Sequence, residues 1–242
     1  MTPTQPTGAT RRQLLGVTGL LALGVVATDA VPATATPVGA PSGATPGARS
    51  WTRDRSANGW PVLTRDDCPA TVIEGSDCTV LLAPGPAATL LAHAARRWHY
   101  EIEALRAGDA VGHDLGPVEA AYLSARLSGT AVSLHPGRHP VGLRGDLSSA
   151  QLLLVRDVLA DCEGLLRWGG DHRSAPAEGT FVLDVGPDHP ALEGVARRLA
   201  GPGDGLAPSP LSAGRSPDPL EPSRQAAART LARRQSVAAA EG

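Results

Sequence analysis

Apolar side chains recur at three- and four-residue steps in two stretches of the chain. In residues 87–105 they line one face of a helix, and Gly108 follows as a stop. A second helix is predicted to begin near Ser148, a favourable N-cap, and to end at Gly164. The apolar face of each helix predicts that both lie in the core.

Short runs of β-branched and other apolar residues, bounded by turn residues, predict strands. The expected segments are 79–82, 130–134, 165–168 and 180–185. Helices and short strands in this order indicate an α+β class. We therefore expect a single small domain in which the two core helices pack on a short antiparallel sheet.

The N-terminal residues have the pattern of an export signal. Thr10-Arg-Arg-Gln-Leu-Leu-Gly16 precedes an apolar run over 14–27, as in twin-arginine signals. The run is shorter than the ~20 residues needed to cross a bilayer. We expect a signal peptide over 1–35, cleaved after Ala33-Thr-Ala35 or after Ala30. The mature protein would then be extracellular or cell-wall-associated, with no transmembrane span.

Composition sets the expected domain boundaries. Residues 36–58 and 201–242 are rich in small residues and Pro, which bury too little apolar surface to offset the entropy of ordering. The first is predicted to be a flexible linker. The second is predicted to be a disordered Pro/Gly/Ala-rich tail, in which 224–240 forms at most a transient helix. The folded domain is then 59–200, a usual domain size.

Charge and cysteine content add two expectations. The formal charge of -2 gives no basic face for nucleic acid, so none is expected as a partner. An exported protein can form disulfides, and Cys68 and Cys78 flank a short segment with a Gly-Ser turn, which predicts that they pair. Cys162 lies on the apolar stripe of the second helix and is expected to be a buried thiol.

One decapeptide carries candidate chemistry. Ser124-Ala-Arg-Leu-Ser-Gly-Thr-Ala-Val-Ser133 resembles the Ser-x-His-x-x-Gly-x-Ala-x-Asp motif of the zinc D-alanyl-D-alanine carboxypeptidase family, which has the Hedgehog/DD-peptidase fold. Similarity extends over 122–184 and includes a later Trp-Gly-Gly-Asp segment. Further matching segments are His139-Pro-Val-Gly142, Arg144-Gly145, Ser149-Ala-Gln151, 155–159, Glu163-Gly164 and Arg167-Trp-Gly-Gly-Asp171.

The metal ligands that this resemblance implies are replaced. Arg126 and Ser133 stand where the family has His and Asp. Thr180 stands for the third ligand, a His, and Ala177 for the general base. A catalytic zinc needs about three ligands from His, Asp, Glu or Cys, together with a bound water. Because an arginine cannot be a ligand and a serine is a poor one, the resemblance implies a degenerate member of the family with no catalytic residues and no metal.

Other residues could in principle rebuild a zinc site. On a strand, His135 would share the face of Ser133, and Asp171 and Glu178 are nearby carboxylates. Each has a simpler explanation, since Asp171 matches a non-ligand position of the family, as does His139. His113 and His172 lie in polar loops, where solvated histidines are usual.

Three functions follow as hypotheses. The leading one is a secreted, cell-wall-associated protein without hydrolytic activity, which binds peptidoglycan stem peptides through a groove containing Arg126, His135, Asp171 and Glu178. In it, the guanidinium of Arg126 would hold a peptide carboxylate. The alternatives are an active zinc D-Ala-D-Ala carboxypeptidase with rearranged ligands, and an exported structural protein. Only the active enzyme would need a cofactor, which is zinc.

Overall fold

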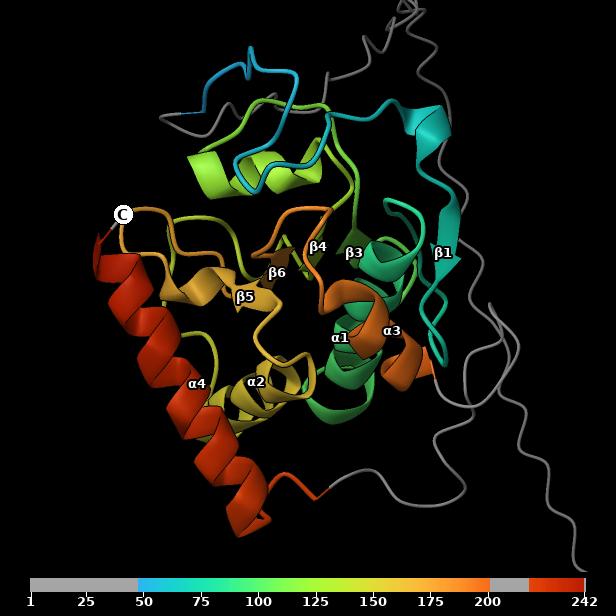
Figure 1. Cartoon of the computed structure of the whole chain (residues 1–242). Coiled ribbons are helices and arrows are strands. Elements are labelled where there is room, and N and C mark those ends of the chain that lie inside the picture. The colour runs from blue at the N-terminus through green and yellow to red at the C-terminus, as the bar shows by residue number, and fades with distance from the viewer. Residues whose placement is uncertain (1–47, 201–217, 242) are drawn as a thin grey trace, which may run out of the picture. The chain divides into compact units, whose positions relative to one another are not determined.

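The computed structural model describes residues 48–200 and 218–241. A four-stranded antiparallel sheet has the strand order β3-β4-β6-β5, and a separate hairpin pairs β1 with β2 (Figure 1). The strands are β1 (Ala70–Val72), β2 (Thr79–Leu81), β3 (Ala110–Val111), β4 (Ala131–Leu134), β5 (Leu166–Trp168) and β6 (Thr180–Leu183).

Helices surround this sheet. The α-helices are α1 (Pro86–Glu101), α2 (Ser149–Asp161), α3 (Leu192–Ala200) and α4 (Pro222–Glu241), and the 3-10 helices are η1 (Arg65–Asp67), η2 (Ala121–Arg126) and η3 (Gly169–Asp171). The α+β class expected from the sequence is therefore confirmed, as are the two core helices and the four predicted strands. The hairpin strand β1 and the edge strand β3 were not predicted, because two or three extended residues carry no readable period. Helix α3 was also missed.

Both core helices begin where the sequence predicts, and α2 ends at Asp161, just before Gly164, whereas α1 ends at Glu101, short of the expected residue 105. Ser148 caps α2 by accepting a hydrogen bond from the Gln151 N–H, and the Gln151 side chain closes a capping box. Beyond the end of α2, Gly164 has a φ of 80°, the left-handed conformation that glycine adopts readily. Helix α1 begins at Pro86, a residue favoured in the first helical turn.

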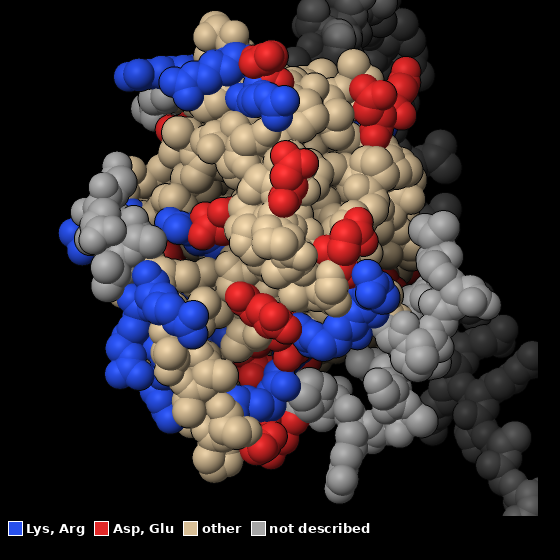
Figure 2. All heavy atoms as spheres, in the orientation of Figure 1, with Lys and Arg blue, Asp and Glu red and all other residues tan. Residues whose placement is uncertain are grey.

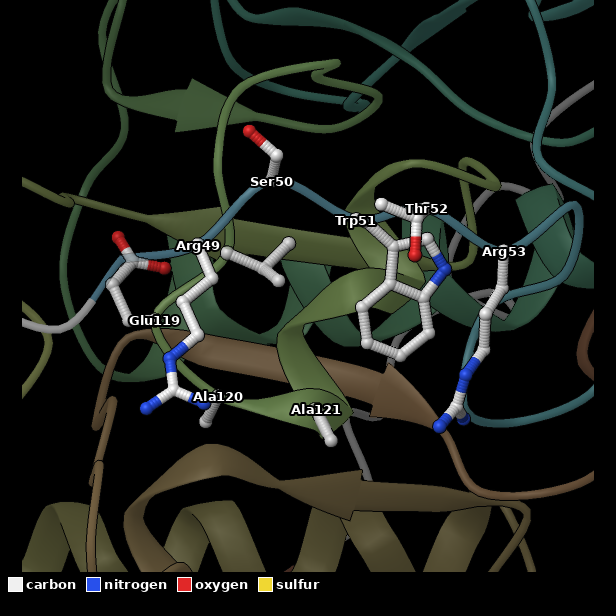
Figure 3. A pocket seen from close by; sticks show the side chains of 9 residues that line it. Arg49, Ser50, Trp51, Thr52, Arg53, Glu119, Ala120 and Ala121 are labelled. Atoms are coloured by element: carbon white, nitrogen blue, oxygen red, sulfur yellow. The ribbon is translucent and has the colours of Figure 1, made fainter.

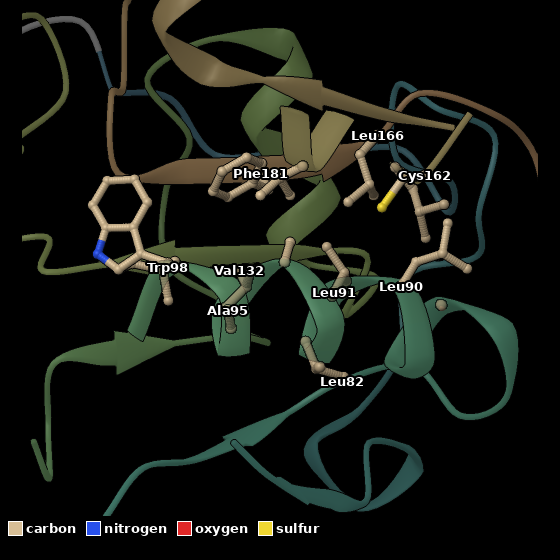
Figure 4. Packing of buried hydrophobic residues seen from close by; sticks show 14 of the residues in the cluster. Leu82, Leu90, Leu91, Ala95, Trp98, Val132, Cys162, Leu166 and Phe181 are labelled. Atoms are coloured by element: carbon tan, nitrogen blue, oxygen red, sulfur yellow. The ribbon is translucent and has the colours of Figure 1, made fainter. Parts of the chain in front are cut away.

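The two faces of the sheet contact different layers. Because side chains alternate along a strand, Val132 and Phe181 point into the main core with α1 and α2, while Ala131 and Val182 pack with η2 on the other face. Figure 4 shows Trp98 and Leu91 of α1 facing the sheet across this core. The molecule thus has α-helices on one face of the sheet and η2 on the other (Figure 1).

The C-terminal end of the linker expected over 36–58 is part of the folded structure. Residues 48–58 lie against the domain: Arg49 pairs with Val118 in a β-bridge, and Asn58 donates hydrogen bonds to Thr130 Oγ1 and the Leu183 carbonyl. Part-buried hydrogen bonds, which composition does not reveal, hold this segment. The rest of the expected linker and the export signal lie outside the described residues.

The expectation of a disordered tail over 201–242 requires correction for residues 218–241, while 201–217 lie outside the described residues. Helix α4 packs against α2, the Ala228 side chain is buried, and Gln235 donates a hydrogen bond to the Leu166 carbonyl. On the face drawn in Figure 2, arginines of the α4 region lie beside acidic groups, so both signs of charge are mixed there. No described helix combines the length and apolarity needed to span a bilayer.

The predicted disulfide is wrong, because all three cysteines are free and buried. The hairpin register pairs Val72 with Thr79, which places Cys78 opposite Ile73 and leaves Cys68 at the other end of the hairpin. A disulfide needs Cα atoms within ~7 Å. Instead, the Cys78 thiol contacts the Arg106 carbonyl oxygen at 2.6 Å. Cys162 is fully buried, as predicted, and burial raises the pKa of its thiol.

Candidate functional site

The sheet brings together two of the positions at which the resemblance implies zinc ligands. Ser133 on β4 pairs with Thr180 on β6 in the strand register, and both point to the η2 face. Their hydroxyl oxygens are 2.9 Å apart and buried. One hydroxyl therefore donates a hydrogen bond to the other, and the contact needs no metal.

The remaining position at which the resemblance implies a zinc ligand, that of Arg126, has a protein partner as well. Arg126 ends η2, and its Nη2 forms an ion pair with the Glu119 carboxylate. Ala177, at the position of the base, is buried and offers no side-chain acid or base. A zinc ion at these positions would meet a guanidinium, two mutually bonded hydroxyls and a methyl group. These residues do not fit the metal that the resemblance implies.

The residues that match the motif have structural roles. Ser124 Oγ accepts a hydrogen bond from the Ala57 N–H at 2.8 Å, and Ser128 Oγ contacts Ser56 Oγ at 3.0 Å. Gly129 has a φ of 63°, and a Cβ there would lie 2.6 Å from the Ala83 nitrogen. The matching residues therefore fix the backbone of this layer and the segment at 56–58.

Asp171 and two of the candidate histidines have other partners. Asp171 receives two hydrogen bonds of 2.6 Å from Arg156 of α2. The His172 ring stacks on Tyr122, and burial, reinforced by Arg167, lowers the pKa of His172 to about 4 although Asp171 opposes this. His113 Nε2 contacts a backbone carbonyl at 2.9 Å. None of the three lies free in a shared site.

His135 does not share a face with Ser133, contrary to the sequence expectation. Strand β4 ends at Leu134, and His135 has a φ of 44°, so the chain leaves the strand there. The His135 ring lies 3.5 Å from Glu103 Oε1 and 3.9 Å from Asp109 Oδ2. Burial lowers the pKa of His135, although Asp109 opposes this effect.

A second histidine lies beside Glu103 and forms a different group of side chains. His139 Nδ1 is 3.5 Å from Asp146 Oδ2, and one atom each of His139, Asp146 and Glu178 lie within 4.8 Å of one another. We call these three residues the His139 cluster. Glu178 was a candidate from the sequence, whereas Asp146 was missed because it lies in a loop with no motif.

A cavity lies elsewhere, on the η2 side. Its volume is about 520 Å³, and it is lined by residues 49–53 and 118–121. Figure 3 shows Arg49 and Arg53 extending to the same side, with Trp51 between them. Glu119, the ion-pair partner of Arg126, also lines the cavity. Within residues 48–200 and 218–241, Arg49 and Arg53 form no ion pair.

Comparison of the chain with family models, with curated proteins and with solved structures found no match. The assignment of a function therefore rests on the geometry of the described residues.

Proposed function

We propose that the chain is an exported, cell-wall-associated protein with a DD-peptidase-like domain that binds peptide carboxylates and does not hydrolyse the peptide. One observation carries the loss of hydrolysis. Ser133 and Thr180, which would be two metal ligands in an active relative, bond to each other at 2.9 Å in a buried position. This pair leaves no strong ligand for an ion that would activate water.

The cavity beside η2 supports the binding role. Two arginines flank an indole face (Figure 3), and guanidinium groups bind carboxylates by paired hydrogen bonds. The Arg53 guanidinium lies over the Trp51 ring at 5.3 Å, so that the N–H groups at the edge of the guanidinium are available for an anion. A short peptide with a C-terminal carboxylate, such as a peptidoglycan stem peptide, matches this combination of charge and apolar surface.

Glu119 modifies the role that the sequence assigns to Arg126. The Glu119 carboxylate already forms an ion pair with the Arg126 guanidinium, in the place that a ligand carboxylate would take. We infer that Glu119 competes with the ligand, so that the peptide must either displace it or use Arg49 and Arg53. This competition makes opposite predictions for two neighbouring variants.

The binding test is calorimetric titration of the protein with a peptide ending in D-Ala-D-Ala, and with its C-terminal amide. We expect the free acid to bind at least about tenfold more tightly, since a charge-assisted hydrogen bond contributes about 1.5–3 kcal/mol. Glu119→Gln should tighten binding by releasing Arg126, and Arg126→Ala should weaken it. Arg229→Ala, an exposed charge-matched change on α4, is the control. Equal affinity for acid and amide would contradict carboxylate binding.

The hydrolysis test is D-Ala release from the same peptide with and without added zinc. We expect no release above the rate without protein. Zinc-dependent release would instead favour the rearranged-ligand carboxypeptidase. If there is neither release nor binding, a structural role becomes the better reading.

A further inference from the structure

The His139 cluster lies apart from the cavity and contains a buried polar side chain without a partner. His139 is 7% exposed, and neither ring nitrogen has a hydrogen-bond partner. A buried polar group without a partner costs free energy. The Trp98 ring packs against the imidazole edge-on, with 5.6 Å between centroids, and so holds it in place without satisfying its nitrogens.

The spacing of the donor atoms suits a metal better than hydrogen bonds. His139 Nδ1 and Asp146 Oδ2 are 3.5 Å apart, which is long for a hydrogen bond. Bonds of ~2.0–2.1 Å in a tetrahedral zinc site place neighbouring donors about 3.3–3.4 Å apart. An ion between the three side chains would therefore require a contraction of at most about 1.4 Å from separations that lie within 4.8 Å.

Further residues are placed as supporting groups of a metal site. Histidines that bind metals commonly donate their other ring N–H to a carboxylate, and Glu103 Oε2 lies 3.7 Å from His139 Nε2. The Glu178 carboxylate accepts hydrogen bonds from the backbone N–H groups of residues 145–147 at 2.8, 3.0 and 3.3 Å. These bonds fix the direction of the carboxylate.

The local charge also favours a cation. Glu103, Asp146 and Glu178 supply three carboxylates around one imidazole. Among residues 48–200 and 218–241, Arg138 is the only arginine that forms an ion pair with any of them, through Glu103. A divalent ion would balance the remaining two charges. The Asp146 side chain is 37% exposed, so that an ion can enter from solvent.

We propose that His139, Asp146 and Glu178 bind one Zn²⁺ ion, which ties the 139–146 loop to the residue pair preceding β6. An imidazole in the donor set favours zinc over magnesium or calcium, which prefer oxygen ligands alone. The site differs from the replaced positions Ser133 and Thr180, and its role is to hold the loop.

The test is titration of the metal-free, full-length chain with ZnCl₂ by calorimetry, together with thermal unfolding with and without zinc. We expect one zinc per chain and a higher Tm with zinc. Asp146→Asn is the informative variant, because the exposed side chain keeps its shape and folding should be retained. We expect it to lose at least about tenfold in zinc affinity, since even supporting groups contribute 10–100-fold.

Asp188→Asn is the matched control, an exposed aspartate outside the cluster, and it should bind zinc as the unchanged protein does. Glu103→Gln should weaken binding less than Asp146→Asn. The proposal is overturned if the full chain takes up no zinc, if Asp146→Asn binds it with unchanged affinity, or if Mg²⁺ raises the Tm and Zn²⁺ does not. Peptide titration of Asp146→Asn should be unchanged, which separates this site from the cavity.

Discussion

Replacing Arg97 with methionine should destabilise the protein strongly, because it breaks a buried charge network between α1 and α2. The Arg97 side chain is 4% exposed and forms ion pairs with Asp157 at 2.9 Å and Asp161 at 2.8 Å. It also donates a 2.6 Å hydrogen bond to Glu101. Methionine retains most of the apolar stem and removes the charge.

The expected loss can be bounded from the exposure of the partners. The Asp157 side chain is 2% exposed, so its carboxylate has little access to water once Arg97 is gone. Removing one partner of a buried pair costs about 3–5 kcal/mol. Arg224 of α4 also bonds to Asp157, at 2.9 and 2.8 Å, and should keep the loss near the lower end, about 3 kcal/mol.

Urea unfolding of the full chain measures this loss, since urea does not screen ion pairs. Arg198→Met is the control, because Arg198 and its partner Glu163 are both about half exposed, and such surface pairs contribute about 0–1 kcal/mol. Combining Arg97→Met with Arg224→Met should cost more than the sum of the single changes, since the double variant leaves Asp157 without a cation. A loss for Arg97→Met no larger than for Arg198→Met would refute the reasoning.

Three further predictions concern the fold. Burial lowers the pKa of His172 to about 4, below the ~6.5 of an unfolded chain. The contribution of neutral His172 to the free energy of unfolding should be complete above pH 6.5 and fall by ~1–2 kcal/mol, after allowance for solvent screening, as the pH drops toward 4. In urea unfolding, His172→Gln should reduce this dependence on pH. An unchanged pH dependence in the variant would contradict the lowered pKa of His172. Gly129→Ala should cost about 2–4 kcal/mol, from its positive φ and the approach to Ala83, whereas Gly137→Ala, with open space around it, should lie within ~1 kcal/mol. Titration of the unfolded, unreduced protein with a thiol reagent should find three thiols, and a count of one would restore the disulfide.

The sequence predicted those elements whose apolar period is long enough to read. The helices α1 and α2 have several turns of regular spacing, and Ser148 and Gly164 mark the start and end of the second. Helix α4 was underestimated for the opposite reason. Its many alanines and arginines give a weak apolar stripe, and its order comes from tertiary contacts such as that between Gln235 and the Leu166 carbonyl, which local sequence does not encode.

In the candidate site, too, some features could be predicted from the sequence and others depend on the packed structure. Ser133 and Thr180 could be brought together in advance because the resemblance implies a metal ligand at each position, whereas their hydrogen bond depends on the register of β4 and β6. The His139 cluster could not be predicted, since its members come from two loops whose paths follow from the packed structure. His135 shows the limit most clearly: a single left-handed residue after β4 overturned the expectation of a shared strand face.

The decapeptide contains two kinds of position, and only one kind bears on function. Ser124, Ser128 and Gly129 match the peptidase motif, and here they bond to residues 56–57 or allow a close backbone approach. Those tasks need no metal. Arg126 and Ser133 depart from the motif, and each is satisfied by a neighbouring protein group. A resemblance carried by packing positions therefore bears on local structure, and the chemistry of the site depends on the groups that stand at the other positions, Arg126 with Glu119 and Ser133 with Thr180.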